Sequence, residues 1–578
     1  MLRKIQQTAG ILNNMNLSSE KTNYMLTGFD PNQITDLDGA RQAIRLLLNL
    51  VEELKQENDQ LRAEVQQLRD EVNRLKGEQG KPSIKPGRKG KAKSDISSEQ
   101  ERRQPRRHRK GSKVAKIVVN REEKLLVDRD QLPPDAQFKG YVPVVIQDIQ
   151  LGTDNVRFLK EKFYSPGEQK SYLAPLPVGY EGEFGPGLRS LVITLYYGSD
   201  MTEPKIVEFL RNVGIYISEG QVSNLLTKQN ERWHREKDAI YRAGLASSSW
   251  QHSDETGTRV NGENQHCHVI SNPLYTAYFT RPGKDRLTII TLLQNVTEPL
   301  FLLNETTVDW LKQFDTPQWA QQVIATWPQE QRLSQTELLT LVQTQLTRLN
   351  SQQQARILEA AALTAYYQQT EVPIVPNLLT DDAPQFRSIT RDHSLCWVHE
   401  GRHYKKLTPF VAYHQQLLAD FRRQFWEYYH KLNAYRADPT PEQATRLKQE
   451  FDQLFSQVTS YDQLDKRIAK TKAKKDRLLK VFSYPEMPLH NNPAELAARR
   501  RVRKRDISFG PRTADGVAAW DTFMTLAATA RQLGVSFYAY IYDRVAGAYA
   551  LPSLADLIRQ YAPAFHPLPQ ECLAAPAY

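Results

Sequence analysis

Cysteine is scarce in this sequence. Its 578 residues include three, Cys267, Cys396 and Cys572. Three widely separated thiols are too few for a disulfide framework or a four-thiolate zinc site. No apolar run approaches the about 18 residues that a membrane-spanning helix needs, and the N-terminus lacks the basic-then-apolar pattern of a signal peptide. We therefore expect a protein of the reducing cytoplasm with no membrane partner.

Positive charge is unevenly distributed. The chain carries 77 Lys and Arg against 66 Asp and Glu, a net charge of +11, and its length predicts about four structural units. Residues 81–116 contain eight Lys and six Arg against three acidic residues, which accounts for the whole surplus. This segment is poor in apolar residues, so we expect a flexible linker that binds a polyanion such as DNA, or a solubilising hinge. The expected DNA contacts in it are Arg102, Arg103, Arg106, Arg107, Arg109 and Lys110.

A strict heptad repeat precedes the basic segment. Its two seam positions hold Ile44, Val51, Asn58, Val65 and Val72 at a, and Leu47, Leu54, Leu61, Leu68 and Leu75 at d. This pattern favours a parallel two-stranded coiled coil in which Asn58 sets the register. Acidic residues at g lie five positions before basic residues at e, so contacts between identical chains are attractive. We predict a homodimer through residues 44–76; an antiparallel hairpin or a packed globular helix is the alternative.

The next segment divides into two parts. Residues 118–184 read as short strands and turns and predict a small β-rich module. Residues 202–213 and 218–226 predict two helices around a turn at Gly214, with Ser218 and Gln221 at capping-box spacing. Such a pair is typical of a helix-turn-helix DNA reader, and simple helical packing is the alternative.

Three acidic residues lie at the ends of predicted elements that are far apart in the sequence. Asp254 ends a strand-like run, Asp381 follows the apolar run VPIVPNLL, and Glu495 lies in the first turn of a predicted helix. Clustered carboxylates suit two divalent ions about 3.5 to 4 Å apart for phosphoryl transfer. Local roles are the alternative: Asp254 in a turn, and Glu495 in a capping box with Asn492 as N-cap, paired with Arg499.

An ordered set of motifs resembles the catalytic core of the insertion sequence family 66 transposases, which are bacterial DDE enzymes. The motifs are HSDETGT, LLTDDAPQF, LCWVHEGRHYKKL, PLHNNPAELAARR and FGPRTADGVAAWDTFMTLAATARQLGVSFYAYI. The resemblance implies that Asp254, Asp381 and Glu495 are the catalytic residues and bind two Mg²⁺ ions, with Mn²⁺ as an alternative ion. Asp382 stands where the family has a Gly-like residue, so the choice between Asp381 and Asp382 stays open.

The resemblance also implies the architecture. We expect an α/β protein with a ribonuclease-H-like catalytic core and helical insertions, preceded by the parallel coiled coil and a small β-rich and helical DNA-binding region. Relatives typically carry a cysteine zinc module before the core, but residues 163–167 contain no Cys, which predicts a metal-free remnant. The expected units are the N-terminal segment (1–37), coiled coil (38–78), basic linker (79–117), β-rich module (118–184), helix-turn-helix region (185–245), core (246–284, 370–403 and 488–515), helical insertions (285–369 and 404–487) and C-terminal helical region (516–578).

Two further groups flank the catalytic positions. Cys396 and His399 form a Cys-x-x-His pair, which offers too few ligands for zinc and predicts structural packing beside the site. Six cations within seven residues follow Glu495 and are expected to bind DNA phosphates, with surface ion pairing as the alternative. They are Arg499, Arg500, Arg501, Arg503, Lys504 and Arg505.

These features together predict a dimeric, nucleoid-associated DDE transposase. Its expected partners are double-stranded DNA, as element terminal repeats and target, a second copy of the chain, and accessory proteins of the element. The alternative is a catalytically inactive dimeric DNA-binding protein, either a decayed transposase or a repressor of its element. Metal-dependent cleavage of element ends distinguishes the two.

Overall fold

The computed structural model describes residues 34, 36–75, 117–149, 151–180 and 182–565. The expected basic linker, with its six DNA contacts, and Cys572 lie outside these residues. No helix within the described ranges is long and apolar enough to cross a membrane.

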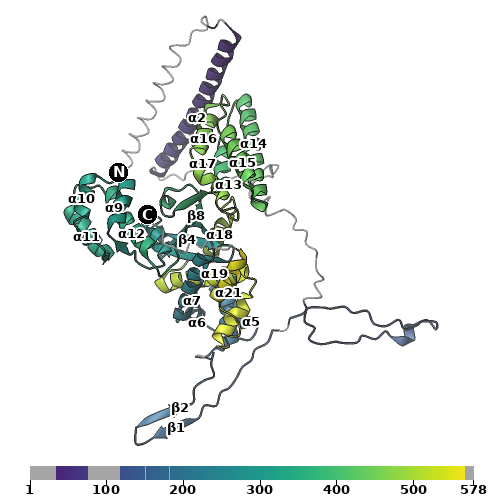
Figure 1. The fold of residues 1–578 in the computed structure, drawn as a ribbon. Coiled ribbons are helices and arrows are strands. Elements are labelled where there is room, and N and C mark those ends of the chain that lie inside the picture. Colours follow the sequence, from purple (N-terminus) through teal and green to yellow (C-terminus); the bar gives the residue numbers. More distant parts are fainter. Residues whose placement is uncertain (1–33, 35, 76–116, 150, 181, 566–578) are drawn as a thin grey trace.

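A five-stranded mixed sheet forms the centre of the fold (Figure 1). Its strand order is β5–β4–β3–β8–β9. Strands β3 (Trp250–Val260), β4 (Glu263–Asn272) and β5 (Tyr275–Arg281) form an antiparallel meander. Strands β8 (Asn377–Thr380) and β9 (Asp392–Leu395) run parallel to β3. The sheet is surrounded by helices, so the predicted α/β class is confirmed.

The turn between β3 and β4 has a clear sequence cause. It consists of Asn261 and Gly262, which both have positive φ, at 48° and 85°. Asn-Gly is the dipeptide that two-residue hairpins favour, because both central residues of the turn require a left-handed backbone. This turn pairs Val260 with Glu263 and sets the register of the whole hairpin.

The free edge of β5 is closed by a helix instead of a further strand. Helix α19 (Ala514–Gln532) lies along it, and Asp521, Thr525 and Thr529 accept hydrogen bonds from N–H groups of alternate β5 residues at 2.6, 3.0 and 3.3 Å. Residues four apart on a helix share a face, as alternate residues do on a strand. The edge therefore presents no unpaired backbone donors at these positions to another chain.

The helices before the sheet and after α19 join the main hydrophobic core. The predicted helix pair is confirmed: α5 (Glu203–Asn212) and α6 (Glu219–Thr227) flank Gly214, and the Ser218 hydroxyl accepts the Gln221 N–H at 3.2 Å. Their buried residues face the core, and DNA contact by the pair stays a prediction. The other helices of this layer are α4 (Pro186–Ile193), α7 (Glu231–Ala246), α20 (Phe537–Val545) and α21 (Leu554–Phe565).

Helices fill both segments for which the sequence predicts insertions. The first packs on the main core and comprises α8 (Arg286–Leu293), α9 (Glu305–Gln313), α10 (Gln318–Ile324), α11 (Gln335–Gln345) and α12 (Ser351–Gln368), with the short strands β6 (Phe301–Leu302) and β7 (Arg332–Leu333). The second has a separate, aromatic-rich core. It comprises α13 (Trp397–Lys405), α14 (Ala412–Ala437), α15 (Pro441–Leu454), α16 (Asp462–Lys472) and α17 (Lys475–Leu478). Most of α13 falls in the expected core range 370–403, but this helix packs with the second group.

The heptad region is one 39-residue helix, α2 (Leu37–Leu75), which lies beside the second insertion (Figure 1). Its outer face contacts that insertion through Asn49, Glu52 and Gln56. The Glu52 carboxylate is buried and accepts the N–H groups of Phe410 and Val411 at 2.9 and 2.6 Å, at the start of α14. By contrast, eight apolar seam side chains of α2 are 39% to 58% exposed.

The expected β-rich module between residues 118 and 184 is mostly wrong. The described residues there form only one hairpin, β1 (Lys162–Ser165) with β2 (Lys170–Leu173). The alternating apolar residues between 142 and 151 are exposed and form no strand. Alternation alone does not make a strand, since a strand needs a hydrogen-bonding neighbour and a core to cover.

Candidate active site

The parallel pairing of β3 and β8 brings two acidic residues to one edge of the sheet. His252 pairs with Leu379 across these strands. Asp254 lies two residues beyond His252, and Asp381 lies two residues beyond Leu379, directly after β8 ends. Both positions therefore lie at the same level of the sheet, although 126 residues separate them in sequence.

The start of α18 (Asn492–Ser508) is attached to β3 by a buried asparagine. Asn491 precedes the helix, and its amide oxygen lies 2.9 Å from His252 Nδ1 while its amide nitrogen donates to the Ser253 carbonyl at 2.8 Å. The helix therefore begins one residue earlier than predicted, with Asn491 at the N-cap position and its side chain bound to the strand. Glu495, in the first turn, is placed beside the sheet edge as a result.

The environment of Asp254 is shaped by burial and by the charges of neighbouring carboxylates. The pKa of Asp254 is raised to about 7, first by burial and then by the negative charges of Glu255, Glu495 and Asp381, partly offset by a backbone hydrogen bond. Buried like charges destabilise one another unless a cation compensates them. Asp254 therefore lies within electrostatic range of Asp381 and Glu495. We call these three residues the carboxylate cluster; their oxygens are donors of the kind that hard divalent cations prefer.

Asp381 and Asp382 have different environments. Asp382 forms ion pairs with Lys474 at 2.8 Å, Arg477 at 2.8 Å and Arg387 at 3.2 Å. These cations lower the pKa of Asp382 although burial opposes the shift. Asp381 has no basic partner within 4 Å among the described residues, and one of its oxygens accepts the Ala383 N–H at 3.0 Å. Because the Asp382 carboxylate is already paired with basic side chains, Asp381 is the better candidate for the second metal-binding carboxylate.

A fourth carboxylate, Glu255, belongs to this region and escapes sequence reasoning. It accepts a hydrogen bond from Gln385 Nε2 at 2.8 Å. Burial, and then the charge of Asp381, raises its pKa to about 6. Strand alternation assigns neighbouring residues to opposite faces, so the sequence gives no signal that Glu255 lies near the Asp381 charge.

Comparison with known proteins identifies the family. The model of the family described as "Transposase IS66 family" matches residues 327–519, which include Asp381 and Glu495. An uncharacterized protein, y4jO, of Sinorhizobium fredii (strain NBRC 101917 / NGR234) is 31% identical over 320 residues, which are 55% of this chain and 99% of that protein. The chain belongs to the IS66 transposase family.

In this IS66 family member, Glu495 is paired with Arg402 instead of the predicted Arg499. Two guanidinium nitrogens of Arg402 lie 3.2 and 3.0 Å from the two carboxylate oxygens, a bidentate geometry. Arg402 also lies 2.9 Å from His399 Nε2. Helix α13 supplies both residues, so the family motif LCWVHEGRH places a cation and an imidazole against the carboxylate of α18.

Cys396, His399 and Glu495 have potential ligand atoms within 4.8 Å of one another. This group does not suit zinc. Cys396 Sγ accepts the Asn491 N–H at 3.2 Å, and burial raises the pKa of its thiol to about 11, so the thiolate that binds metal is disfavoured. The geometry agrees with the expected packing role of the Cys-x-x-His pair.

The basic cluster of α18 is divided between the surface and the interior. Arg501 is 1% exposed, lies 3.3 Å from Asp521 and donates to the Thr280 hydroxyl at 2.8 Å. Lys504 is fully buried and donates to the Tyr196 carbonyl at 2.5 Å. The predicted DNA contacts through Arg501 and Lys504 are therefore wrong for this structure.

The remaining cations of the cluster stay available to a partner at the surface. Arg499 and Arg503 are exposed, and Arg500 is half-buried. Arg505 is also half-buried and donates to the Gly257 carbonyl at 2.6 Å.

Proposed function

We propose that this IS66 family member is a DDE transposase with a ribonuclease-H-like core. It cleaves the DNA ends of its element and joins them to target DNA by metal-dependent phosphoryl transfer. The observation that carries the proposal is the position of Asp254 and Asp381 at one sheet edge, where the charges of Asp381 and Glu495 help to raise the pKa of Asp254. The strand order and the directions of the five strands support the fold assignment.

The carboxylate cluster fits two Mg²⁺ ions, with Mn²⁺ as an alternative. Its oxygens are hard donors; Asp254 has no ion pair within 4 Å among the described residues, whereas Glu495 is paired with Arg402. Bound ions of this type activate the attacking oxygen and neutralise charge on the transferred phosphoryl group. The chain holds Asp254 and Asp381 on the sheet, and it holds Glu495 through Asn491 and Arg402.

We propose two successive reactions at this site. Water attacks a phosphodiester at the element end in the carboxylate cluster, and the freed 3′ hydroxyl then attacks target DNA in line. We propose that Arg499, Arg500, Arg503 and Arg505 hold the phosphate backbone on the same helix that carries Glu495. The linker arginines expected from the sequence add non-specific affinity.

We also propose that α2 forms the parallel homodimer. Its seam is exposed, whereas its outer face is occupied by the second insertion of the same chain. One helix can therefore contact a second copy and its own catalytic region at the same time. A dimer places two active sites in one complex, as the processing of two element ends requires.

The test is cleavage and joining of a labelled element end by the full chain in Mg²⁺. We expect the parent protein to cut and join, and Asp254→Asn, Asp381→Asn and Glu495→Gln to lose both steps. Asp382→Asn is the matched control, because it removes a neighbouring carboxylate with structural contacts, and it retains detectable cutting when folded. Parent-rate cutting by Asp254→Asn refutes the assignment, and DNA binding without cutting by the parent protein supports a non-catalytic binder.

A further inference from the structure

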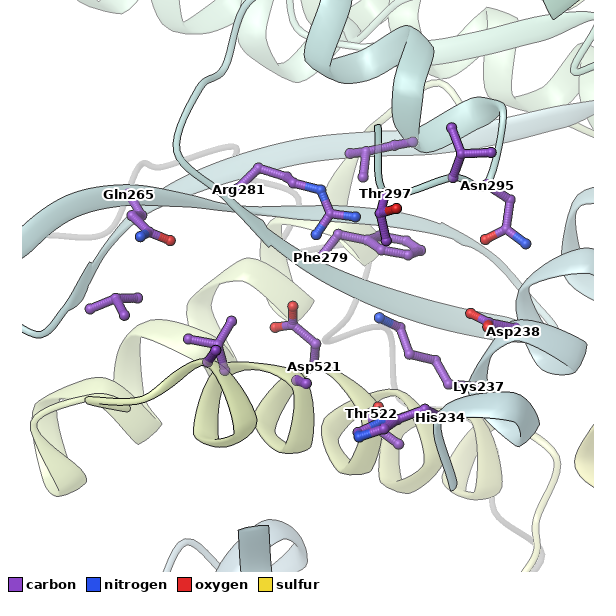
Figure 2. Close-up of a pocket in the computed structure, with 16 residues that line it drawn as sticks. His234, Lys237, Asp238, Gln265, Phe279, Arg281, Asn295, Thr297, Asp521 and Thr522 are labelled. Atoms are coloured by element: carbon purple, nitrogen blue, oxygen red, sulfur yellow. Dashed lines mark hydrogen bonds between the residues drawn. The ribbon is translucent and has the colours of Figure 1, made fainter. Parts of the chain in front are cut away.

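A cavity of about 520 Å³ lies outside the carboxylate cluster. It is open on one side and is lined by α7, the ends of β4 and β5, the segment after α8 and the start of α19 (Figure 2). None of its lining residues is used in the proposed reaction. Its volume lies within the range of about 300 to 1,000 Å³ typical of small-molecule sites.

Two cations point into this cavity (Figure 2). Lys237 on α7 has its ammonium 4.2 Å from the centre of the Phe279 ring, and it has no hydrogen bond or ion pair within the described residues. Arg281 at the end of β5 donates to the Thr280 carbonyl, while its buried Nε has no hydrogen-bond partner there. Burial lowers the pKa of Lys237; the charges of Asp521 and Asp238 oppose this shift, and the charge of Arg281 adds to it.

The acidic residues of the cavity form no ion pair with Lys237 or Arg281 among the described residues, although their charges act on Lys237. Asp521 lines the cavity, accepts two hydrogen bonds from Thr280, at 2.6 and 2.8 Å, and lies 3.3 Å from Arg501. Asp238 is exposed at the rim. A buried donor that lacks a partner costs about 1 to 3 kcal/mol, so an anion bound between the two cations is favoured.

The other lining residues indicate more than a simple anion site. The side chains of Gln265, Asn295 and Thr297 form no hydrogen bonds within the described part of the chain. Leu292 and Phe279 provide an apolar wall. Polar groups beside an apolar wall suit a ligand that combines a charged group with a flat, hydrogen-bonding ring.

We propose that this cavity binds a nucleotide, with its phosphate between Lys237 and Arg281 and its base against the wall formed by Phe279 and Leu292. The nucleotide comes either from solution or from a DNA strand that extrudes one base. The second source rests on the proposed function, whereas the site itself does not.

The test uses the 5′-monophosphate of 2-aminopurine deoxyribonucleoside, a fluorescent nucleotide, titrated into the full chain. We expect at least tenfold tighter binding of this probe than of the nucleoside without phosphate. Lys237→Met and Arg281→Gln each weaken probe binding at least tenfold. Lys312→Met, which removes an exposed lysine on α9, is the matched control and leaves binding unchanged.

Two results overturn the proposal. One is equal affinity for probe and nucleoside, and the other is parent-like probe binding by both folded variants, verified by circular dichroism. Addition of duplex DNA identifies the source of the natural nucleotide. Displacement of the probe indicates a nucleotide extruded from DNA, and retention of the probe indicates a free nucleotide. Both outcomes require that the cavity binds the probe. Asp254→Asn binds the probe like the parent protein, so a failure of the transposase assignment does not affect this measurement.

Discussion

Lys504 provides a quantitative test of how α18 is oriented. Its ammonium is buried between the rings of Tyr196 and Trp520, at 3.7 and 5.1 Å from their centres. Burial lowers its pKa from 10.5 to about 7, while Asp200 and Glu203 oppose the shift and Arg501 adds to it. We predict that Lys504→Met removes a pH-dependent contribution to stability that the parent protein shows between pH 7 and 10.5.

The sign follows from proton binding. Between pH 7 and 10.5, Lys504 is protonated in the unfolded chain and largely neutral in the folded protein, so unfolding takes up a proton and stability rises with pH. A difference of 3.5 pKa units, at about 1.36 kcal/mol per unit, sets an upper limit of roughly 5 kcal/mol for this rise. The neighbouring rings stabilise the cation, so we expect roughly half of that limit. Below pH 7 the difference between parent and variant is constant.

The assay is urea unfolding of parent protein and Lys504→Met at pH 7, 8 and 9, followed by circular dichroism. The difference between the two free energies of unfolding isolates Lys504 from other groups that titrate in this range. Lys205→Met, which removes an exposed lysine on α5, is the control and should show no trend with pH. A parent-minus-variant difference that does not change with pH refutes the buried position of Lys504.

Three further predictions concern DNA, helix docking and assembly. Arg503→Gln should weaken DNA binding uniformly across sequences and reduce the slope of log affinity against log salt concentration by about 1. Lys504→Met should leave this slope unchanged. Equal effects of the two substitutions would contradict the assignment of Arg503 to the surface and Lys504 to the interior. Glu52→Ala should destabilise the contact between α2 and the N-terminus of α14 by about 1 to 3 kcal/mol, which would appear as faster amide hydrogen exchange from residue 410 onward. Glu53→Ala, which changes a neighbouring residue of α2, should not speed this exchange. Leu54→Asp with Leu61→Asp should convert the dimer to monomer in sedimentation equilibrium, and a persistent dimer would place the interface elsewhere.

The sequence predicts the helix pair around Gly214 well, because the pair depends on local signals. Ser218 at the N-cap of α6 is one such signal. The convergence of Asp254, Asp381 and Glu495 is not local, since it depends on strand order and on Asn491 reaching β3. The family motifs, as a set, supplied that prediction.

The error at the basic cluster has a recognisable cause. Ala494, Ala498, Arg501 and Lys504 follow one another at spacings of four, three and three, and all four are buried. Helical periodicity therefore marks Arg501 and Lys504 as inward-facing positions, whereas counting charges assigns all six cations to the surface. The error at residues 142–151 is different, because strand formation there depends on a partner strand that no local pattern reveals.

The most direct test of the central claim is metal binding by the DNA-bound full chain, measured by electron paramagnetic resonance with Mn²⁺. We predict two Mn²⁺ ions per active site with the magnetic coupling of a close pair in the parent protein. Asp254→Asn and Glu495→Gln should each lose the coupled signal, while Asp382→Asn keeps it. A coupled signal that persists unchanged in Asp254→Asn contradicts the account, because the ions would then be bound without the carboxylate cluster.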